Sequence, residues 1–205
     1  MRLARVVSIW ALLAAALGVP IALSFTSELL EWRGPVYIIA GLAGMIALGL
    51  ALVQPLLIAG YLPALAGYRG RRVHHWVGGA LVVAVLIHVG GLWITSPPDM
   101  IDALTYTSPT PFSPWGVTAM WAIFAVAFLA LFRRRLGLRT WRIVHMALAV
   151  VIVSGSVVHA MLVEGTMETI SKAALCALVV VAAIKVIVDL MQRKTRPMRS
   201  SSDGP

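Results

Sequence analysis

Six long apolar stretches dominate this sequence and leave little chain for anything else. They cover approximately residues 5–25, 35–60, 73–95, 115–132, 142–163 and 170–191. A helix needs about 20 predominantly apolar residues to cross the hydrocarbon core of a bilayer, and inside that core only helices and closed barrels satisfy all backbone polar groups. The pattern therefore predicts an all-α polytopic membrane protein, in which residues 1–192 form one bundle of six transmembrane helices.

The composition supports a membrane protein without a large soluble domain. Of the 205 residues, 60% are apolar and only 12% are charged, whereas about a quarter of a typical soluble domain is charged. Residues 193–205 are basic, and we expect a disordered cytoplasmic tail that docks on anionic lipid headgroups. The first stretch follows Arg2 and Arg5 as in a signal peptide, but it is long and lacks a convincing cleavage site. We expect it to remain as a helix.

Charged residues alternate between the two sides of the predicted bundle. Basic clusters lie at Arg2 and Arg5; at Arg69, Arg71 and Arg72; at Arg133, Arg134, Arg135, Arg139 and Arg142; and at Arg193, Lys194, Arg196 and Arg199. The opposite loops contain Glu28, Glu31, Asp99, Asp102, Glu164 and Glu168, with only Arg33 and Lys172 against them. Short cytoplasmic loops are enriched in Lys and Arg, so we expect a multi-pass protein of the cell inner (plasma) membrane with both termini cytoplasmic. The net charge of +9 follows this topology and does not predict nucleic-acid binding, because it forms no single basic face.

The longest connection between two spans runs from Thr95 to Pro114. It contains five prolines, and a proline inside a helix removes a backbone hydrogen bond and clashes with the preceding turn. We therefore predict a surface loop here.

All five histidines lie in or at the ends of the third and fifth spans. His74 and His88 are separated by 14 residues, and so are His145 and His159. At about 100° per residue, 14 steps return a side chain to within roughly 40° of its starting direction. The rise of about 1.5 Å per residue separates the two members of a pair by roughly 21 Å along the axis. Each helix therefore presents two histidines on one face, one toward each membrane surface.

The third and fifth spans run parallel, because a single span lies between them. Equal spacing brings His74 level with His145 on the cytoplasmic side, where they would hold the iron of an inner haem. It brings His88 level with His159 on the exported side, where they would hold the iron of an outer haem. Ionisable side chains inside a membrane are costly and tend to be functional, and a haem iron with two imidazole ligands is suited to one-electron transfer. The spacing therefore predicts two b-type haems.

Two other roles compete with haem ligation. Zinc would need about four ligands at one level, whereas these histidines lie in two tiers, and Cys176 is the only cysteine. A proton relay usually recruits carboxylates within the spans, and Asp189 near the end of the sixth span is the only one. The alternative function is therefore a haem-free membrane protein that acts as an ion or proton pathway or as an assembly subunit.

Residues near the histidines are candidates for supporting roles. His75 lies on a different face from His88, so we expect it to be an interfacial side chain. The alternative is that His75, and not His74, is the ligand. Arg71, Arg72 and Arg142 lie beside the predicted inner haem and are candidates for bidentate pairs with its propionates, although the charge rule alone also explains them. Three glycines are candidates either to admit a flat macrocycle or to mediate helix contacts: Gly78, Gly79 and Gly155.

With these residues in view, the chain resembles the ferric reductase-like transmembrane domain family, the membrane core of ferric reductases and NADPH oxidases. The resemblance rests on Arg-Arg-Val-His74-His75-Trp-Val-Gly-Gly through His88, and on Trp141-Arg142-Ile-Val-His145 through His159. It implies an electron-transfer subunit of an oxidoreductase. Electrons would enter from the cytoplasm, pass the inner haem and then the outer haem, and leave to an acceptor on the exported side.

The chain departs from the larger members of this family in one respect. Full-length reductases continue into a flavin- and nicotinamide-binding domain, whereas this sequence ends soon after its sixth span and contains no Gly-rich dinucleotide motif. We therefore expect a separate flavin-dependent electron donor, with flavin supplied only through that partner. In this the chain is similar to the haem-binding membrane subunit of periplasmic methionine sulfoxide reductase, whose pattern usually lacks a counterpart of His74.

Overall fold

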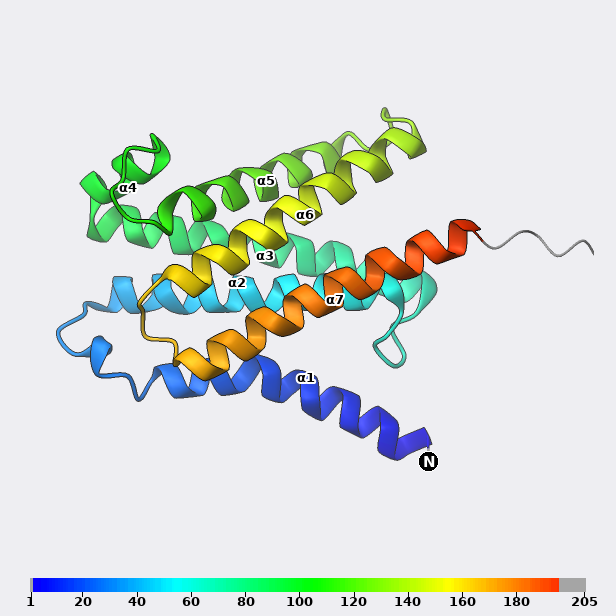
Figure 1. The fold of residues 1–205 in the computed structure, drawn as a ribbon, viewed down its shortest axis with the longest axis horizontal. Helices are drawn as coiled ribbons and strands as arrows, with labels where there is room; N and C mark the ends of the chain where they lie inside the picture. The colour runs from blue at the N-terminus through cyan, green and yellow to red at the C-terminus, as the bar shows by residue number, and fades with distance from the viewer. Residues whose placement is uncertain (1, 196–205) are drawn as a thin grey trace, which may run out of the picture.

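A computed structural model of the chain describes residues 2–195, and these form a helical bundle (Figure 1). The six long helices are α1 (Arg2–Ser24), α2 (Pro35–Ala59), α3 (Gly67–Thr95), α5 (Ser113–Leu131), α6 (Leu138–Leu162) and α7 (Thr169–Thr195). A 3-10 turn, η1 (Glu28–Leu30), and a short helix, α4 (Pro97–Leu104), lie in the connections, and the described residues contain no strand. All six long helices are long and apolar enough to cross a membrane. The predicted six-span polytopic membrane bundle is thus confirmed.

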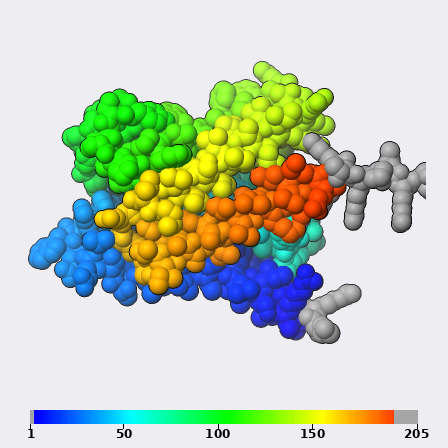
Figure 2. Space-filling view, viewed as in Figure 1, coloured from blue at the N-terminus to red at the C-terminus, as the bar shows by residue number. Residues whose placement is uncertain are grey.

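The bundle is built from two antiparallel helical hairpins and two covering helices. α2 packs along α3, and α5 packs along α6. α7 lies against both α2 and α6, and α1 lies against α2 and α7. In Figure 2, α6 and α7 run side by side across one face of the molecule. The seam between the two hairpins is therefore covered by α7.

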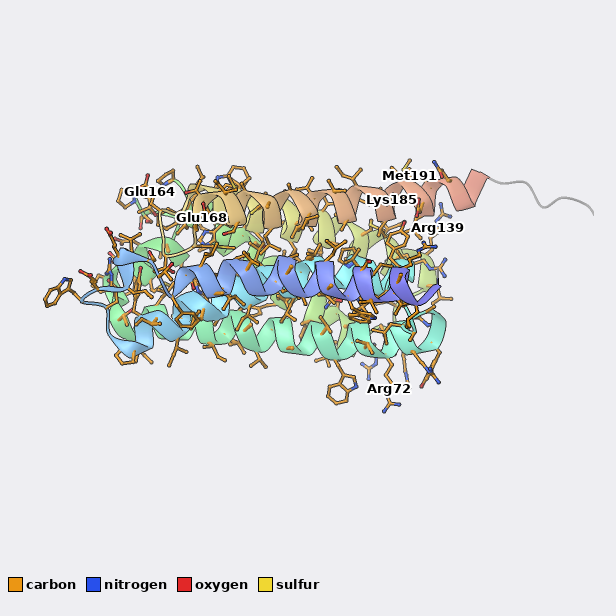
Figure 3. All side chains as sticks on the ribbon, turned by 90° about the horizontal axis from the view of Figure 1, so that it is seen from below. Arg72, Arg139, Glu164, Glu168, Lys185 and Met191 are labelled. Carbon is orange, nitrogen blue, oxygen red and sulfur yellow. The ribbon has the colours of Figure 1, made fainter. Side chains whose placement is uncertain are left out.

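Charges divide the bundle into two ends. We call the end with the α2–α3 and α5–α6 turns, the start of α1 and the end of α7 the basic end, and the opposite end the acidic end. Figure 3 shows Arg72, Arg139 and Lys185 at the former and Glu164 and Glu168 at the latter. Both ends of the described chain lie at the basic end (Figure 1).

Several helices extend beyond their apolar cores. α3 begins at Gly67 rather than near residue 73, so the arginines expected in the turn lie on its first turns. α6 likewise begins at Leu138 and includes Arg139 and Arg142. Arginine is a good helix former, so these helices continue past the hydrocarbon region. α7 continues to Thr195 and takes in the first three residues of the predicted tail, and residues 196–205 lie outside the described part of the chain.

The proline-rich connection after α3 contains a helix, which corrects the prediction of an irregular loop. α3 does end at Thr95, but Pro97 and Pro98 begin α4 instead of preventing it. The first helical positions need no intrahelical amide donor and their φ suits proline. Met100 and Ala103 of α4 are buried, so this helix also packs against the acidic end of the bundle.

Lys172 lies in the first turn of α7, within the predicted sixth span, although the charge comparison counted it with the loop residues. Its side chain is only 7% exposed, and its Nζ donates to the backbone carbonyl of Val163 at 2.8 Å. Val163 is the C-cap of α6, whose last carbonyls have no partner within the helix. The lysine therefore ties the end of α6 to the start of α7.

Candidate functional site

The four histidines predicted as ligands meet in two pairs between α3 and α6. His74 and His145 form the basic-end pair, with ring centroids 6.2 Å apart and an interplanar angle of 69°. His88 and His159 form the acidic-end pair, with corresponding values of 6.4 Å and 78°. α3 itself packs mainly on α2, and α6 on α5, so each ring reaches across from a different hairpin. This is the pairing that the 14-residue spacing predicts, while the ligand role stays a prediction.

The ring separations fit one metal ion between each pair. A metal–imidazole bond is about 2 Å long, and bond lengths of about 1.3 Å place each nitrogen roughly 1.1 Å from the ring centre. Two imidazoles on opposite sides of one metal therefore have ring centres about 6 Å apart, close to the observed 6.2 and 6.4 Å. Among residues 2–195, no group of three or more His, Cys, Asp or Glu side chains converges on one metal position. Each pair thus suits a metal whose remaining ligands come from its own macrocycle.

Backbone carbonyls hold both rings of the acidic-end pair. The Nδ1 of His88 lies 2.8 Å from the carbonyl oxygen of Ala40 in α2. The Nδ1 of His159 lies 3.0 Å from the carbonyl oxygen of Phe112, at the start of α5. A carbonyl oxygen only accepts hydrogen bonds, so each Nδ1 must carry the proton and donate it. The Nε2 lone pair of each ring is therefore free to bind a metal.

The basic-end pair lacks this arrangement. The Nδ1 atoms of His74 and His145 are buried and make no hydrogen bond of ordinary geometry among the described residues, although the Gln54 backbone carbonyl lies beside His74. Trp141, one turn before His145 on α6, stacks beside its ring at a centroid distance of 5.0 Å. Buried polar atoms normally find partners, so the protein fixes the rings of this pair less firmly than those of the acidic-end pair.

His75 lies outside both pairs. It is exposed, and its Nε2 accepts a hydrogen bond from the Arg133 guanidinium at 2.7 Å. Guanidinium has only donors, so this nitrogen is already occupied. The geometry agrees with the expected interfacial role and leaves His74 as the residue that faces α6.

The predicted propionate contacts are exposed at the basic end. Arg71, Arg72 and Arg142 all face solvent, and within the described residues the only salt bridge joins Lys185 to Asp189. No carboxylate of the described chain forms an ion pair with these three guanidinium groups. Their role toward a cofactor stays a prediction.

The three predicted glycines have different surroundings. A Cβ at Gly155 would lie 2.9 Å from the carbonyl oxygen of Trp115 and 3.0 Å from the Cβ of Ala119, so this glycine serves the contact between α5 and α6. Gly78 faces the side-chain amide of Gln54, whereas a Cβ at Gly79 would meet nothing within 4 Å. Of the three, only Gly79 has open space beside it.

A polar cluster at the basic end was missed by the sequence analysis. The Tyr61 hydroxyl, just after α2, donates to a carboxylate oxygen of Asp189 in α7. The Lys185 ammonium donates to the Tyr61 oxygen at 3.0 Å and to the other Asp189 oxygen at 2.6 Å. Asp189 was the one carboxylate available for a proton relay, and these bonds tie it to a lysine and to the α2–α3 turn. The i, i+4 spacing of Lys185 and Asp189 on one helix was the available signal.

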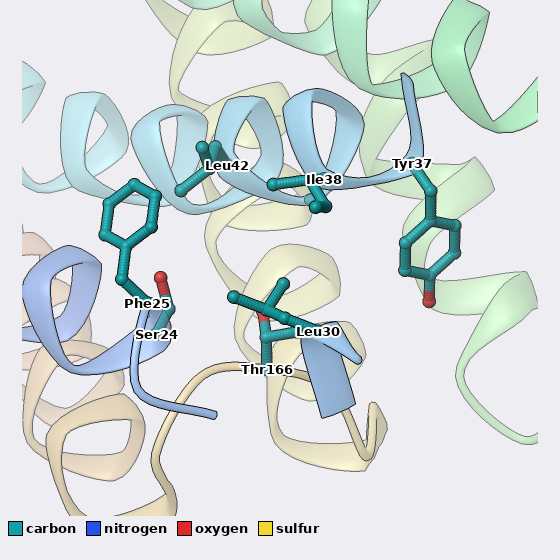
Figure 4. A pocket seen from close by; sticks show the side chains of 8 residues that line it. Ser24, Phe25, Leu30, Tyr37, Ile38, Leu42 and Thr166 are labelled. Atoms are coloured by element: carbon teal, nitrogen blue, oxygen red, sulfur yellow. The ribbon is translucent and has the colours of Figure 1, made fainter. Parts of the chain in front are cut away.

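A small pocket at the acidic end carries no comparable chemistry (Figure 4). It lies where the end of α1, the start of α2 and the α6–α7 connection meet. Its lining is mostly apolar, with Tyr37 as the only titratable side chain among the lining residues. It offers no pair of charged or metal-binding groups.

Comparison with known families gives one match. Residues 43–156, more than half of the chain, match the family described as ferric reductase like transmembrane component. The chain belongs to the ferric reductase-like transmembrane family. The matched segment contains His74, His88 and His145 and ends just before His159. No curated protein and no solved structure matches the chain.

Membership in this family indicates a general class of function. The ferric reductase-like family implies a membrane component of electron transfer, and its members usually bind haem. The six apolar helices make this chain a multi-pass membrane protein.

Proposed function

We propose that this chain is a transmembrane b-type cytochrome. It would pass electrons through two bis-histidine haems, from a separate cytoplasmic, flavin-dependent donor to an acceptor on the exported side. The observation that carries the proposal is the pair of facing histidine couples, each at the separation that one metal requires, in a member of a family of membrane electron-transfer components.

Each histidine pair would hold one of the two haems. His74 and His145 would hold the inner haem at the basic end, and His88 and His159 the outer haem at the acidic end. A haem iron with two axial imidazoles supplies one-electron transfer without an open position for small ligands. The apolar helices would surround the haems, and the hydrogen bonds of His88 and His159 would tune the outer haem.

The orientation of the bundle follows from its charges. Arginines gather at the basic end and carboxylates at the acidic end, as in Figure 3, and positive residues favour the cytoplasm. We therefore assign the basic end to the cytoplasm of a cell with an inner (plasma) membrane. Arg71, Arg72 and Arg142 would then be available to the inner haem propionates and to an electron donor.

Spectroscopy of the purified protein tests the proposal. Reduced-minus-oxidised spectra in detergent, with a haem assay, should give b-type bands and two haems per chain. His159→Ala should halve the haem content, whereas His75→Ala, the matched control on α3, should retain both haems. A wild-type protein without b-type absorbance, purified folded and with haem supplied during expression, would contradict the proposal and favour the ion-pathway or assembly role.

Orientation and donor need separate measurements. Alkaline phosphatase fused after Glu164 should be active, because that site would be exported, and the same enzyme fused after Arg135 should be inactive. NAD(P)H with a cytosolic flavin reductase should reduce the haems of right-side-out vesicles only when the reductase is loaded inside. Reduction from outside alone would reverse the proposed direction of electron flow.

A further inference from the structure

Two glycines lie directly against the rings of the acidic-end pair. A Cβ placed on Gly44 in α2 would lie 2.9 Å from the Nδ1 of His88, and one placed on Gly116 in α5 would lie 2.5 Å from the Nδ1 of His159. Non-bonded atoms pack at about 3.5 to 4.0 Å. Any side chain at either position must therefore displace the imidazole ring.

Each glycine stands four residues after the carbonyl that accepts from the same ring. Gly44 follows Ala40, the acceptor for His88, and Gly116 follows Phe112, the acceptor for His159. Side chains four residues apart lie one above the other on a helix, so a side chain at the later position covers the earlier carbonyl oxygen. The Phe112 oxygen also accepts the backbone N–H of Gly116 at 3.2 Å, and its second lone pair is open to the imidazole.

The basic-end pair has no such glycines. In α2, the contact of Gln54 with Gly78 shows that the antiparallel register of α2 and α3 continues to this end. Moving 14 residues from Gly44 toward the basic end reaches Ile58, and the same step from Gly116 reaches Ala130. Both positions carry side chains, and neither Nδ1 of His74 and His145 makes a hydrogen bond of ordinary geometry, although the Gln54 backbone carbonyl lies beside His74. The glycines that contact the imidazole rings are therefore found at one of the two sites.

We propose that Gly44 and Gly116 are positioning residues that uncover the Ala40 and Phe112 carbonyls and so fix both axial histidines of the outer haem. This inference rests on the proposed function, since it assigns the histidines to haem. A ring whose Nδ1–H donates to a carbonyl is a more basic ligand and stabilises the oxidised, more positive iron. The two hydrogen bonds should therefore lower the midpoint potential of the outer haem, and loss of either bond should raise it.

The test compares alanine substitutions at four glycines in the full-length, haem-loaded protein. Gly44→Ala and Gly116→Ala each place a Cβ on an imidazole ring. Gly41→Ala in α2 and Gly90→Ala in α3 are matched controls, because a Cβ at either position would meet nothing within 4 Å. Alanine favours helix over glycine by about 1 kcal/mol, so weaker helices would not explain a defect.

Redox titration and low-temperature EPR give the readouts. In Gly44→Ala and Gly116→Ala we expect one of the two midpoint potentials to rise and one of the two low-spin EPR signals to move, or that haem alone to be lost. The other haem should titrate as in the wild type, and the two control variants should match the wild type in both haems.

The outcomes separate the inference from the proposed function. If both variants bind two haems with unchanged potentials and EPR signals, the inference is wrong and the proposed function stands. Loss of both haems from both variants would also overturn it, because the effect is assigned to one site. A folded wild-type protein without any haem would instead refute the proposed function itself.

Discussion

At the acidic end each histidine ring donates to a backbone carbonyl of its own neighbouring helix, whereas at the basic end neither Nδ1 makes a hydrogen bond of ordinary geometry and only His74 has a backbone carbonyl, that of Gln54, beside it. The ring separations of the two pairs are nevertheless almost equal, at 6.4 and 6.2 Å. Two histidine pairs with the same spacing thus lie in different surroundings. The difference teaches that histidine spacing determines where two rings meet, while the neighbouring helices determine how firmly each ring is held.

Removing one ligand from each tier gives the largest expected effect. His74→Ala and His88→Ala should each eliminate one haem and leave the other, so each variant isolates the site that the other loses. The haem left in His74→Ala should have the lower midpoint potential of the two, because its histidine ligands donate hydrogen bonds and are more basic. Spectroelectrochemical titration of the two variants measures both values directly, and equal potentials would remove the proposed difference between the ends.

The rates of haem release from the two pairs should also differ, but by less than the complete loss of a haem. One hydrogen bond is worth about 1 kcal/mol, and two such bonds hold the rings of the acidic-end pair. We expect basic-end haem to transfer to apomyoglobin at least about tenfold faster, giving two kinetic phases. His74→Ala should lack the fast phase, and a single phase in the wild type would contradict the difference in ring fixation.

Tyr61→Phe should loosen the basic end without touching either histidine pair. It removes hydrogen bonds to the charged groups of Asp189 and Lys185, and solvent screening weakens such bonds at an exposed position. We expect the thermal midpoint to fall by a few degrees with the haem spectrum unchanged. Tyr68→Phe is the control, because Tyr68 is 72% exposed. A changed haem spectrum would show that the cluster acts on the site.

The smallest effect concerns the acidic end at low pH. Backbone amides of Ser171 and Ile170 donate to the Glu168 carboxylate, and these bonds, that of Ser171 foremost, lower the pKa of Glu168. Because the folded-state pKa is depressed, the stabilisation is present above the ordinary glutamate value of about 4.3 and is lost as pH falls through the folded value.

Glu168→Gln should therefore be less stable than the wild type near pH 7, and the difference should shrink below about pH 4. Thermal unfolding across this range measures it, with Glu164→Gln, which alters the neighbouring exposed loop, as the control. A difference that stays constant with pH would argue against the capping role.

The main architecture was predictable because its causes lie within single segments. Apolar length identified the six spans, and the spacing from His74 to His88 predicted the face that they share. The interpretation of Pro97 as a breaker was wrong for α4, because a proline's effect depends on whether it occupies the first turn or the interior of a helix. Only the structure reveals which of these applies.

Features that join two helices were harder to foresee. The fixation of His88 depends on Ala40 and Gly44, which lie in α2 rather than on the histidine's own helix. Counting outward from the α2–α3 turn would place Gly44 opposite His88, but that count requires the turn and the register to be known. The same applies to Tyr61 and Asp189, which are far apart in the sequence.

Each ring of the acidic-end pair is oriented by its own hairpin, His88 by α2 and His159 by α5. Neither hairpin needs the other for this step, so each is a self-contained half of the site during biogenesis. We expect the two hairpins to enter the bilayer one after the other, each with its imidazole already oriented. Cofactor binding would come last and would link the two hairpins. If the pairs bind haem as proposed, cells starved of iron would accumulate an inserted chain that is completed when haem is supplied.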